Sequence, residues 1–155
     1  MADTTQTAGA LELSYERTFA APRASVFAAW TDPEILARWW GPKTHTIPEV
    51  SLDPKVGGAW MTLMRSPEGT EHRVSGVYRE ISPPTRLVFT WAWGFDGQRG
   101  HETVVTVEFD EVPEGTLMRF HQAAFESPDM TVAHDQGWTS TFEKFADFAA
   151  AGGLG

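Results

Sequence analysis

Two adjacent tryptophans, followed at once by glycine and proline, constrain the fold of this chain more than any other feature. Trp39 and Trp40 each carry a large apolar ring system that is costly to leave in water. Gly41-Pro42 then ends the short helix that carries both tryptophans. We therefore expect the tryptophan pair to pack as a lid where short helices meet a sheet.

A pair of adjacent glycines follows the tryptophans. Gly57-Gly58 permits a turn or a bulge that a side chain would block. We expect Gly58 either to hold a backbone conformation closed to other residues or to allow close packing by a neighbouring strand.

The rest of the chain predicts one strand, two short helices, six strands and one long helix. The first strand is expected at 11–20 and the short helices at 22–30 and 33–40, with Asp32 as an N-cap before Pro33. Turn signals such as Asp96-Gly97 separate the later strands. These strands are expected at 44–52, 59–65, 71–81, 87–95, 101–110 and 116–124. Short turns between consecutive strands predict an antiparallel meander.

The last helix has a regular apolar face. Ser127-Pro128-Asp129 supplies its start, and Gly152-Gly153 lies past its end. Its large residues recur every three or four positions, at Trp138, Thr141, Phe142, Phe145, Phe148 and Ala149. The order of elements predicts an α+β helix-grip fold: a curved antiparallel sheet wrapped around a long C-terminal helix, with two short helices after the first strand.

Size and charge limit the domain organisation and the partners. The 155 residues suit one domain, placed at 11–150 after a disordered N-terminal tail at 1–10. A formal net charge of −9 argues against nucleic acid and anionic membranes as partners.

The absence of cysteine excludes disulfides and thiolate metal sites. No signal peptide or membrane span is recognisable, so we expect a cytoplasmic protein, either a monomer or a homodimer.

A series of short motifs, in order, resembles a known family. The motifs are Phe19-Ala20-Ala21-Pro22, Val26-Phe27-Ala28-Ala29-Trp30, Thr31-Asp32-Pro33, Trp39-Trp40-Gly41-Pro42, Val56-Gly57-Gly58, Gly76-Val77-Tyr78-Arg79-Glu80-Ile81, Pro83-Pro84-Thr85-Arg86-Leu87-Val88, Thr90-Trp91, Val104-Val105-Thr106-Val107, Gly115-Thr116 and Gly137-Trp138. Their order and spacing resemble the activator of heat-shock-protein ATPase homologue (AHSA-type) family, within the START-like SRPBCC superfamily. The resemblance implies a START-like domain, whose relatives commonly bind apolar or aromatic molecules in a hydrophobic cavity.

Strand alternation and the helical stripe define the candidate ligand-binding residues. Bulky apolar side chains share the face that should look toward the helix, for example Phe89, Trp91 and Trp93 on one strand. The full candidate set is Trp60, Met64, Tyr78, Phe89, Trp91, Val105, Val107, Met118, Phe120, Gln122, His134, Trp138 and Phe142. From the residues alone, a core filled by these side chains is an equal alternative to a pocket, and the resemblance favours the pocket.

Histidines and one glutamine are the candidate polar groups. His134 lies four residues before Trp138 and could act at the cavity mouth as an acid, a base or a donor, whereas a solvated histidine is the competing interpretation. Gln122 is an expected inward polar group, and His45 could sit at the rim. His72 could face inward, although a surface position is preferred. The histidine spacing matches no metal motif, so we expect no metal and no cofactor.

Three functions remain open. The leading one is a START-like protein that binds a small hydrophobic or aromatic molecule in an internal cavity. The second is an enzyme of the polyketide cyclase or hydrolase type, in which His134, Gln122 and Tyr78 would orient a substrate. The third is a single-domain, co-chaperone-like activator of the heat-shock-protein ATPase. Convergent polar groups would favour the enzyme, and a large exposed apolar patch would favour a protein partner.

Overall fold

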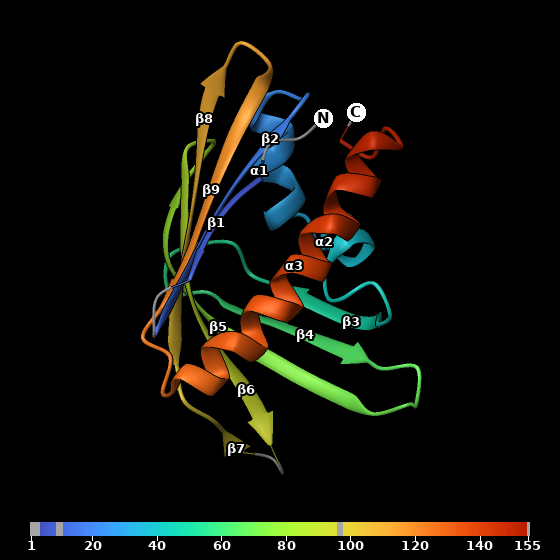
Figure 1. Ribbon diagram of the computed structural model, residues 1–155, viewed down its shortest axis with the longest axis vertical. Helices are drawn as coiled ribbons and strands as arrows, with labels where there is room; N and C mark the ends of the chain where they lie inside the picture. The colour runs from blue at the N-terminus through green and yellow to red at the C-terminus, as the bar shows by residue number, and fades with distance from the viewer. Residues whose placement is uncertain (1–3, 9–10, 96–97, 155) are drawn as a thin grey trace.

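A curved antiparallel sheet wraps a long helix in the computed structural model, which describes residues 4–8, 11–95 and 98–154 (Figure 1). The helices are α1 Arg23–Thr31, α2 Pro33–Trp39 and α3 Pro128–Ala150. The strands are β1 Thr4–Ala8, β2 Glu12–Phe19, β3 Thr46–Leu52, β4 Ala59–Arg65, β5 Glu71–Ser82, β6 Arg86–Phe95, β7 Gln98–Arg99, β8 Thr103–Val112 and β9 Gly115–Ala123.

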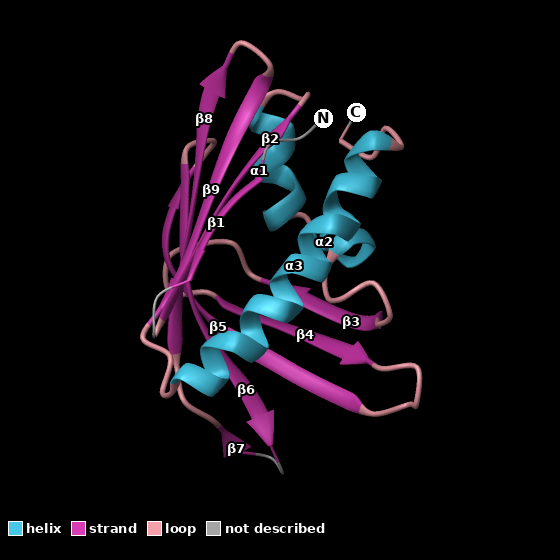
Figure 2. Ribbon diagram, in the orientation of Figure 1, coloured by secondary structure: helices cyan, strands magenta, loops and turns pink. Residues whose placement is uncertain are grey.

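The sheet runs in the order β1-β2-β9-β8-β6-β5-β4-β3, and β7 pairs with β6. All three helices lie on one side of it, and α3 crosses that side diagonally (Figure 2). The predicted α+β helix-grip fold is therefore confirmed. Within the described part of the chain, no helix is both long enough and apolar enough to cross a membrane.

Two local expectations need correction. A disordered tail was expected at 1–10, but residues 4–8 form β1 and pair antiparallel with β2. This pairing satisfies backbone groups of β2 that would otherwise lie at a sheet edge. The second correction concerns the loop expected after β6, which includes the short strand β7 paired with β6. The predicted turn residues Asp96 and Gly97 lie outside the described residues, as do residues 1–3 and 9–10 of the expected tail.

Helix starts follow the capping residues in the sequence. The Asp32 carboxylate accepts a hydrogen bond from the Glu34 amide, and Pro33 occupies the first turn of α2. The helix ends before Gly41, whose φ of 77° suits glycine. At α3, the Ser127 hydroxyl accepts from the Met130 amide. These local signals fix where α2 and α3 begin, and α3 forms one wall of the site described below.

The tryptophan pair is packed, as predicted. Trp39 and Trp40 are 0% and 2% exposed. The Trp39 ring stacks on Phe145 of α3 with centroids 4.0 Å apart, and its Nε1 donates to the Ala29 carbonyl at 2.9 Å. Trp40 Nε1 donates to Thr62 Oγ1 of β4 at 2.9 Å. The pair thus joins the short helices to both α3 and the sheet.

Two glycines permit close backbone approach in the sheet region. A Cβ added at Gly58 would lie 2.0 Å from the Asp53 carbonyl oxygen, so the close approach expected there exists, but it is made by the turn after β3 and not by a strand. A Cβ at Gly76 would lie 1.8 Å from the Thr90 carbonyl oxygen and 2.6 Å from Trp60 Nε1. Because Trp60 Nε1 donates to that carbonyl at 2.9 Å, a larger residue at Gly76 would disrupt the sheet.

The stacked position of Trp39 generates a stability prediction. Trp39→Ala removes a fully buried ring and its hydrogen bond, so the free energy of unfolding should fall by about 3–5 kcal/mol. Urea denaturation measures this loss. Val56→Ala is the control, because Val56 is 68% exposed and its truncation should change stability by no more than about 0.5 kcal/mol. A loss below about 1 kcal/mol for Trp39→Ala would contradict the packing role.

Candidate functional site

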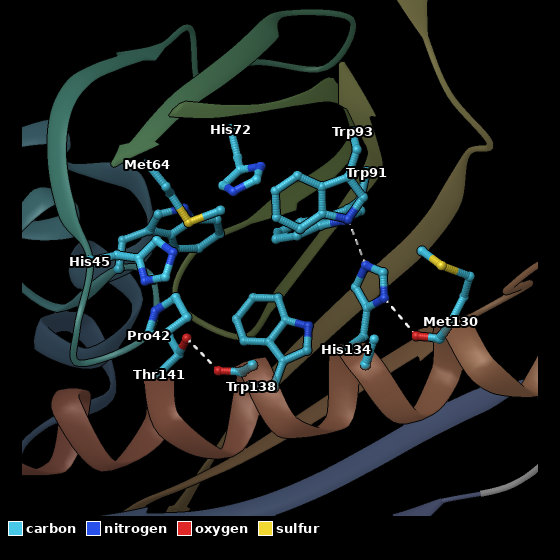
Figure 3. Close-up of a pocket in the computed structure, with 14 residues that line it drawn as sticks. Pro42, His45, Met64, His72, Trp91, Trp93, Met130, His134, Trp138 and Thr141 are labelled. Carbon is cyan, nitrogen blue, oxygen red and sulfur yellow. Dashed lines mark hydrogen bonds between the residues drawn. The ribbon is translucent and has the colours of Figure 1, made fainter. Parts of the chain in front are cut away.

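A pocket of about 370 Å³ lies between α3 and the sheet (Figure 3). The helix contributes Met130, Ala133, His134, Gly137, Trp138 and Thr141. The sheet contributes Met64 of β4, His72 of β5, and Trp91 and Trp93 of β6. The segment after α2 contributes Trp40, Gly41, Pro42 and His45. Most of this surface is apolar, and tryptophan rings from three elements form much of it.

The structure divides the predicted candidate set between this pocket and the core. Met64, Trp91, His134 and Trp138 line the pocket. The other candidates are buried core residues outside it, namely Trp60, Tyr78, Phe89, Val105, Val107, Met118, Phe120, Gln122 and Phe142. A pocket and a filled core therefore adjoin each other, and the Phe120 and Trp138 rings at their boundary have centroids 4.5 Å apart.

Trp30 explains why the candidates outside the pocket do not enclose a comparable space. Its ring, from α1, lies 6.2 Å from Phe120, 6.3 Å from Phe89 and 6.4 Å from Phe142 between centroids. A small pocket beside it, which Trp60 also lines, measures only about 10 Å³. Strand parity could not reveal this, because the ring that fills the space comes from a helix.

His134 is buried and fully engaged by neighbouring groups. It is 8% exposed, which makes the solvated interpretation wrong. Its Nε2 accepts from Trp93 Nε1 at 2.8 Å, and its Nδ1 lies 2.8 Å from the Met130 carbonyl oxygen (Figure 3). The two partners require a neutral ring with its proton on Nδ1. Burial lowers the pKa of His134, and the bond to the Met130 carbonyl opposes that shift.

This arrangement argues against acid–base work by His134. Protonation of Nε2 would place two N–H groups against each other at the Trp93 contact. Deprotonation of Nδ1 would leave the Met130 carbonyl without its donor. The imidazole instead holds the Trp93 ring in place and so shapes the pocket wall.

Gln122 has a comparable positioning role in the core. The residue is 0% exposed. Its Oε1 accepts from Trp138 Nε1 at 2.7 Å, and its Nε2 donates to Thr103 Oγ1 at 2.8 Å. Gln122 is thus inward-facing, as predicted, but it fixes the Trp138 ring rather than facing the pocket.

Tyr78 is the third residue, with His134 and Gln122, that the enzyme hypothesis expected to orient a substrate. It lies in the core, 3% exposed, and burial raises the pKa of its phenol well above the ordinary value. Of Tyr78, Gln122 and His134, only His134 lines the pocket. The three polar groups therefore do not converge on a common substrate position.

The polar part of the pocket lies at its mouth. The rings of His45 and His72 lie there with their centroids 6.3 Å apart and their planes inclined by 39°. His45 Nδ1 lies 3.1 Å from Thr44 Oγ1. Lys144 Nζ donates to the Trp40 carbonyl at 2.8 Å and to the His45 carbonyl at 3.5 Å, which ties this loop to α3. No group of residues in the described ranges has the arrangement of a metal site.

Gly137 forms an unusual part of the helical wall. It lies inside α3, where glycine is less favourable than alanine by about 1 kcal/mol. A Cβ added there would meet nothing within 4 Å, so packing does not demand glycine. The missing side chain leaves space open along the pocket. The sequence contains the glycine, but only the fold shows that it faces this space.

Most of the chain is similar to one protein family. Residues 20–150 match the family model described as Activator of Hsp90 ATPase homolog 1-like protein. The AHSA1 protein of Silicibacter pomeroyi is 31% identical, with a TM-score of 0.84 over 90% of this chain and 98% of that one. The AHSA1-like protein of Aeromonas hydrophila is 26% identical, with a TM-score of 0.76 over 94% and 96% of the two chains. No curated protein matches the sequence.

A protein from Arthrobacter aurescens is also similar. It is 26% identical, with a TM-score of 0.83 over 96% of this chain and 91% of that one. The similarity therefore extends over nearly the full length of the domain, including α3 and the strands that border the pocket.

The buried neutral His134 generates a pH prediction. Its pKa is lower in the folded than in the unfolded chain, so its stabilisation is present above the unfolded value of about 6.5 and is lost as pH falls toward the folded value. The free energy of unfolding should fall between about pH 7 and pH 5, by at most about 1.4 kcal/mol per pH unit for this proton. Urea denaturation across that range should show a shallower slope for His134→Gln.

His121→Gln controls for the loss of an imidazole in general. His121 lies on β9, away from the pocket and with a half-exposed side chain. Equal slopes for the wild type and His134→Gln would contradict the buried neutral state.

Proposed function

This chain belongs to the Activator of Hsp90 ATPase homolog 1-like family, and we propose that it binds a small apolar or aromatic molecule in the pocket beside α3. The observation that carries the proposal is a largely apolar pocket whose helical wall is kept open by Gly137. Its volume of about 370 Å³ lies within the range of small-molecule sites.

The pocket wall is held in shape before any ligand binds. Hydrogen bonds fix the rings of Trp93 and Trp138 through His134 and Gln122. A preformed wall loses little conformational entropy when a ligand binds, which supports affinity for a flat apolar molecule. Ring faces also interact favourably with an aromatic ligand.

The same contacts make catalysis a weaker candidate. Acid–base chemistry needs a titrating group with a free lone pair or proton at the substrate. Both ring nitrogens of His134 are already engaged, and Gln122 and Tyr78 lie outside the pocket. The geometry thus supports binding more directly than turnover.

A protein-partner function has little support from the exposed apolar residues. In the described part of the chain, the large hydrophobic side chains classed as exposed are Leu11, Val56, Val77 and Val132. They belong to four segments of the chain, of which those of Val56 and Val77 are joined by the Gly57–Tyr78 hydrogen bond, and a few exposed apolar side chains are normal. A docking surface for a chaperone would need a contiguous patch.

Gly137→Leu tests the proposal without weakening the helix. N-phenyl-1-naphthylamine, a neutral fluorescent aromatic, should bind the wild type saturably with a blue-shifted emission. The leucine side chain should occupy part of the pocket and lower the affinity about tenfold or more, since forcing a ligand against the added volume costs about 1–3 kcal/mol. Urea unfolding should show equal stability or a gain of up to about 1 kcal/mol.

The matched control is Gln136→Leu on the exposed side of α3, one residue away. It adds the same side chain outside the pocket and should leave the probe affinity unchanged. Non-saturable binding to the wild type, or equal affinity in Gly137→Leu and Gln136→Leu, would contradict ligand binding at this pocket.

A further inference from the structure

We propose that the ligand carries an anionic oxygen group, such as a carboxylate, that is bound between His45 and His72 at the mouth of the pocket. The inference rests on the proposed binding function and specifies the chemical class of the ligand as an aromatic or hydrophobic anion. The apolar body would lie inside, against the tryptophan rings, with the charged group toward solvent.

The inner part of the pocket offers few polar partners. Trp93 Nε1 donates to His134 Nε2, and Trp138 Nε1 donates to Gln122 Oε1. The Thr141 hydroxyl donates to the Gly137 carbonyl at 2.8 Å. Trp91 Nε1 has no hydrogen-bond partner among the described residues, but it is covered by protein atoms. A polar group on the ligand would therefore be poorly solvated inside and should lie at the mouth.

The mouth presents two imidazoles suited to one small acceptor. In the described part of the chain, neither His45 Nε2 nor a ring nitrogen of His72 has a hydrogen-bond partner. A hydrogen bond spans roughly 2.8 Å. A centroid separation of 6.3 Å is compatible with one anion that accepts from both rings.

The charges around the mouth favour an anion over a cation. Lys144 lies beside His45, and the pocket-lining residues of the described chain include no aspartate or glutamate. Tryptophan rings can also hold a quaternary ammonium group by cation–π attraction. That arrangement would place a positive charge close to Lys144 and two imidazoles, so we favour the anion.

Anion binding should be coupled to proton uptake. Burial lowers the pKa of His45, and the neighbouring His72 of β5 and Lys144 of α3 lower it further. Glu68, in the turn between β4 and β5, acts in the opposite direction. A bound anion stabilises the protonated imidazole. The affinity for an anion should thus increase as pH falls from about 8 to about 6.

Three naphthalene derivatives that differ in one group test this inference. 2-Naphthoate, 2-naphthamide and a naphthyl-trimethylammonium cation are titrated calorimetrically and by displacement of N-phenyl-1-naphthylamine. At pH 6 naphthoate should bind about tenfold tighter than naphthamide, since hydrogen bonds to a charged group are the stronger ones. The difference should shrink at pH 8 and disappear in the double variant His45→Gln/His72→Gln. His121→Gln should retain it.

The outcomes separate this inference from the proposed function. If the neutral probe binds saturably but naphthamide or the cation matches naphthoate at pH 6, the anion assignment is wrong and the pocket function stands. The same holds if the double variant, folded by urea denaturation, retains the preference for naphthoate. If neither the probe nor any naphthalene derivative binds, both proposals fail.

Discussion

The contact between Trp39 and Phe145 is the interaction on which the rest of the structure depends. The two rings are stacked, and both residues are 0% exposed. Trp39 comes from a seven-residue helix that could not be stable alone. Its ring binds that helix to α3, and the next residue, Trp40, reaches β4 through Thr62. The resulting junction sets the distance between α3 and the sheet, and so the room left between them.

Three tryptophans, two on helices and one on β6, decide which part of that room is filled. Trp30 packs among Phe89, Phe120 and other aromatic residues, where it completes the core. Beside this core, two hydrogen bonds hold the Trp93 and Trp138 rings in the pocket wall through His134 and Gln122. Gly137 adds no side chain to the space that remains. The pocket is thus defined by polar contacts behind its apolar lining.

Buried polar residues in this protein have positional roles that a catalytic interpretation would miss. A histidine or glutamine beside a pocket invites assignment as an acid, a base or an orienting group. Here the hydrogen-bonding groups of His134 and Gln122 are both paired with other protein atoms. An unsatisfied polar group would be costly in this environment, which explains why each has two partners. The polar groups still open to a ligand lie at the mouth, on His45 and His72.

The sequence by itself determined the helices, the longer strands, the faces of those strands and the family resemblance, because these depend on local rules, whereas the short strands β1 and β7 were not predicted. Asp32, Pro33 and Ser127 mark helix starts through short-range capping, and strand alternation correctly turns Trp91 and Met118 inward. Only the tertiary structure decided where space remains between those elements. The position of Trp30 and the burial of His134 depend on contacts between segments that lie far apart in the chain. No periodicity within one strand or helix encodes whether a ring from another element will fill the gap beside it.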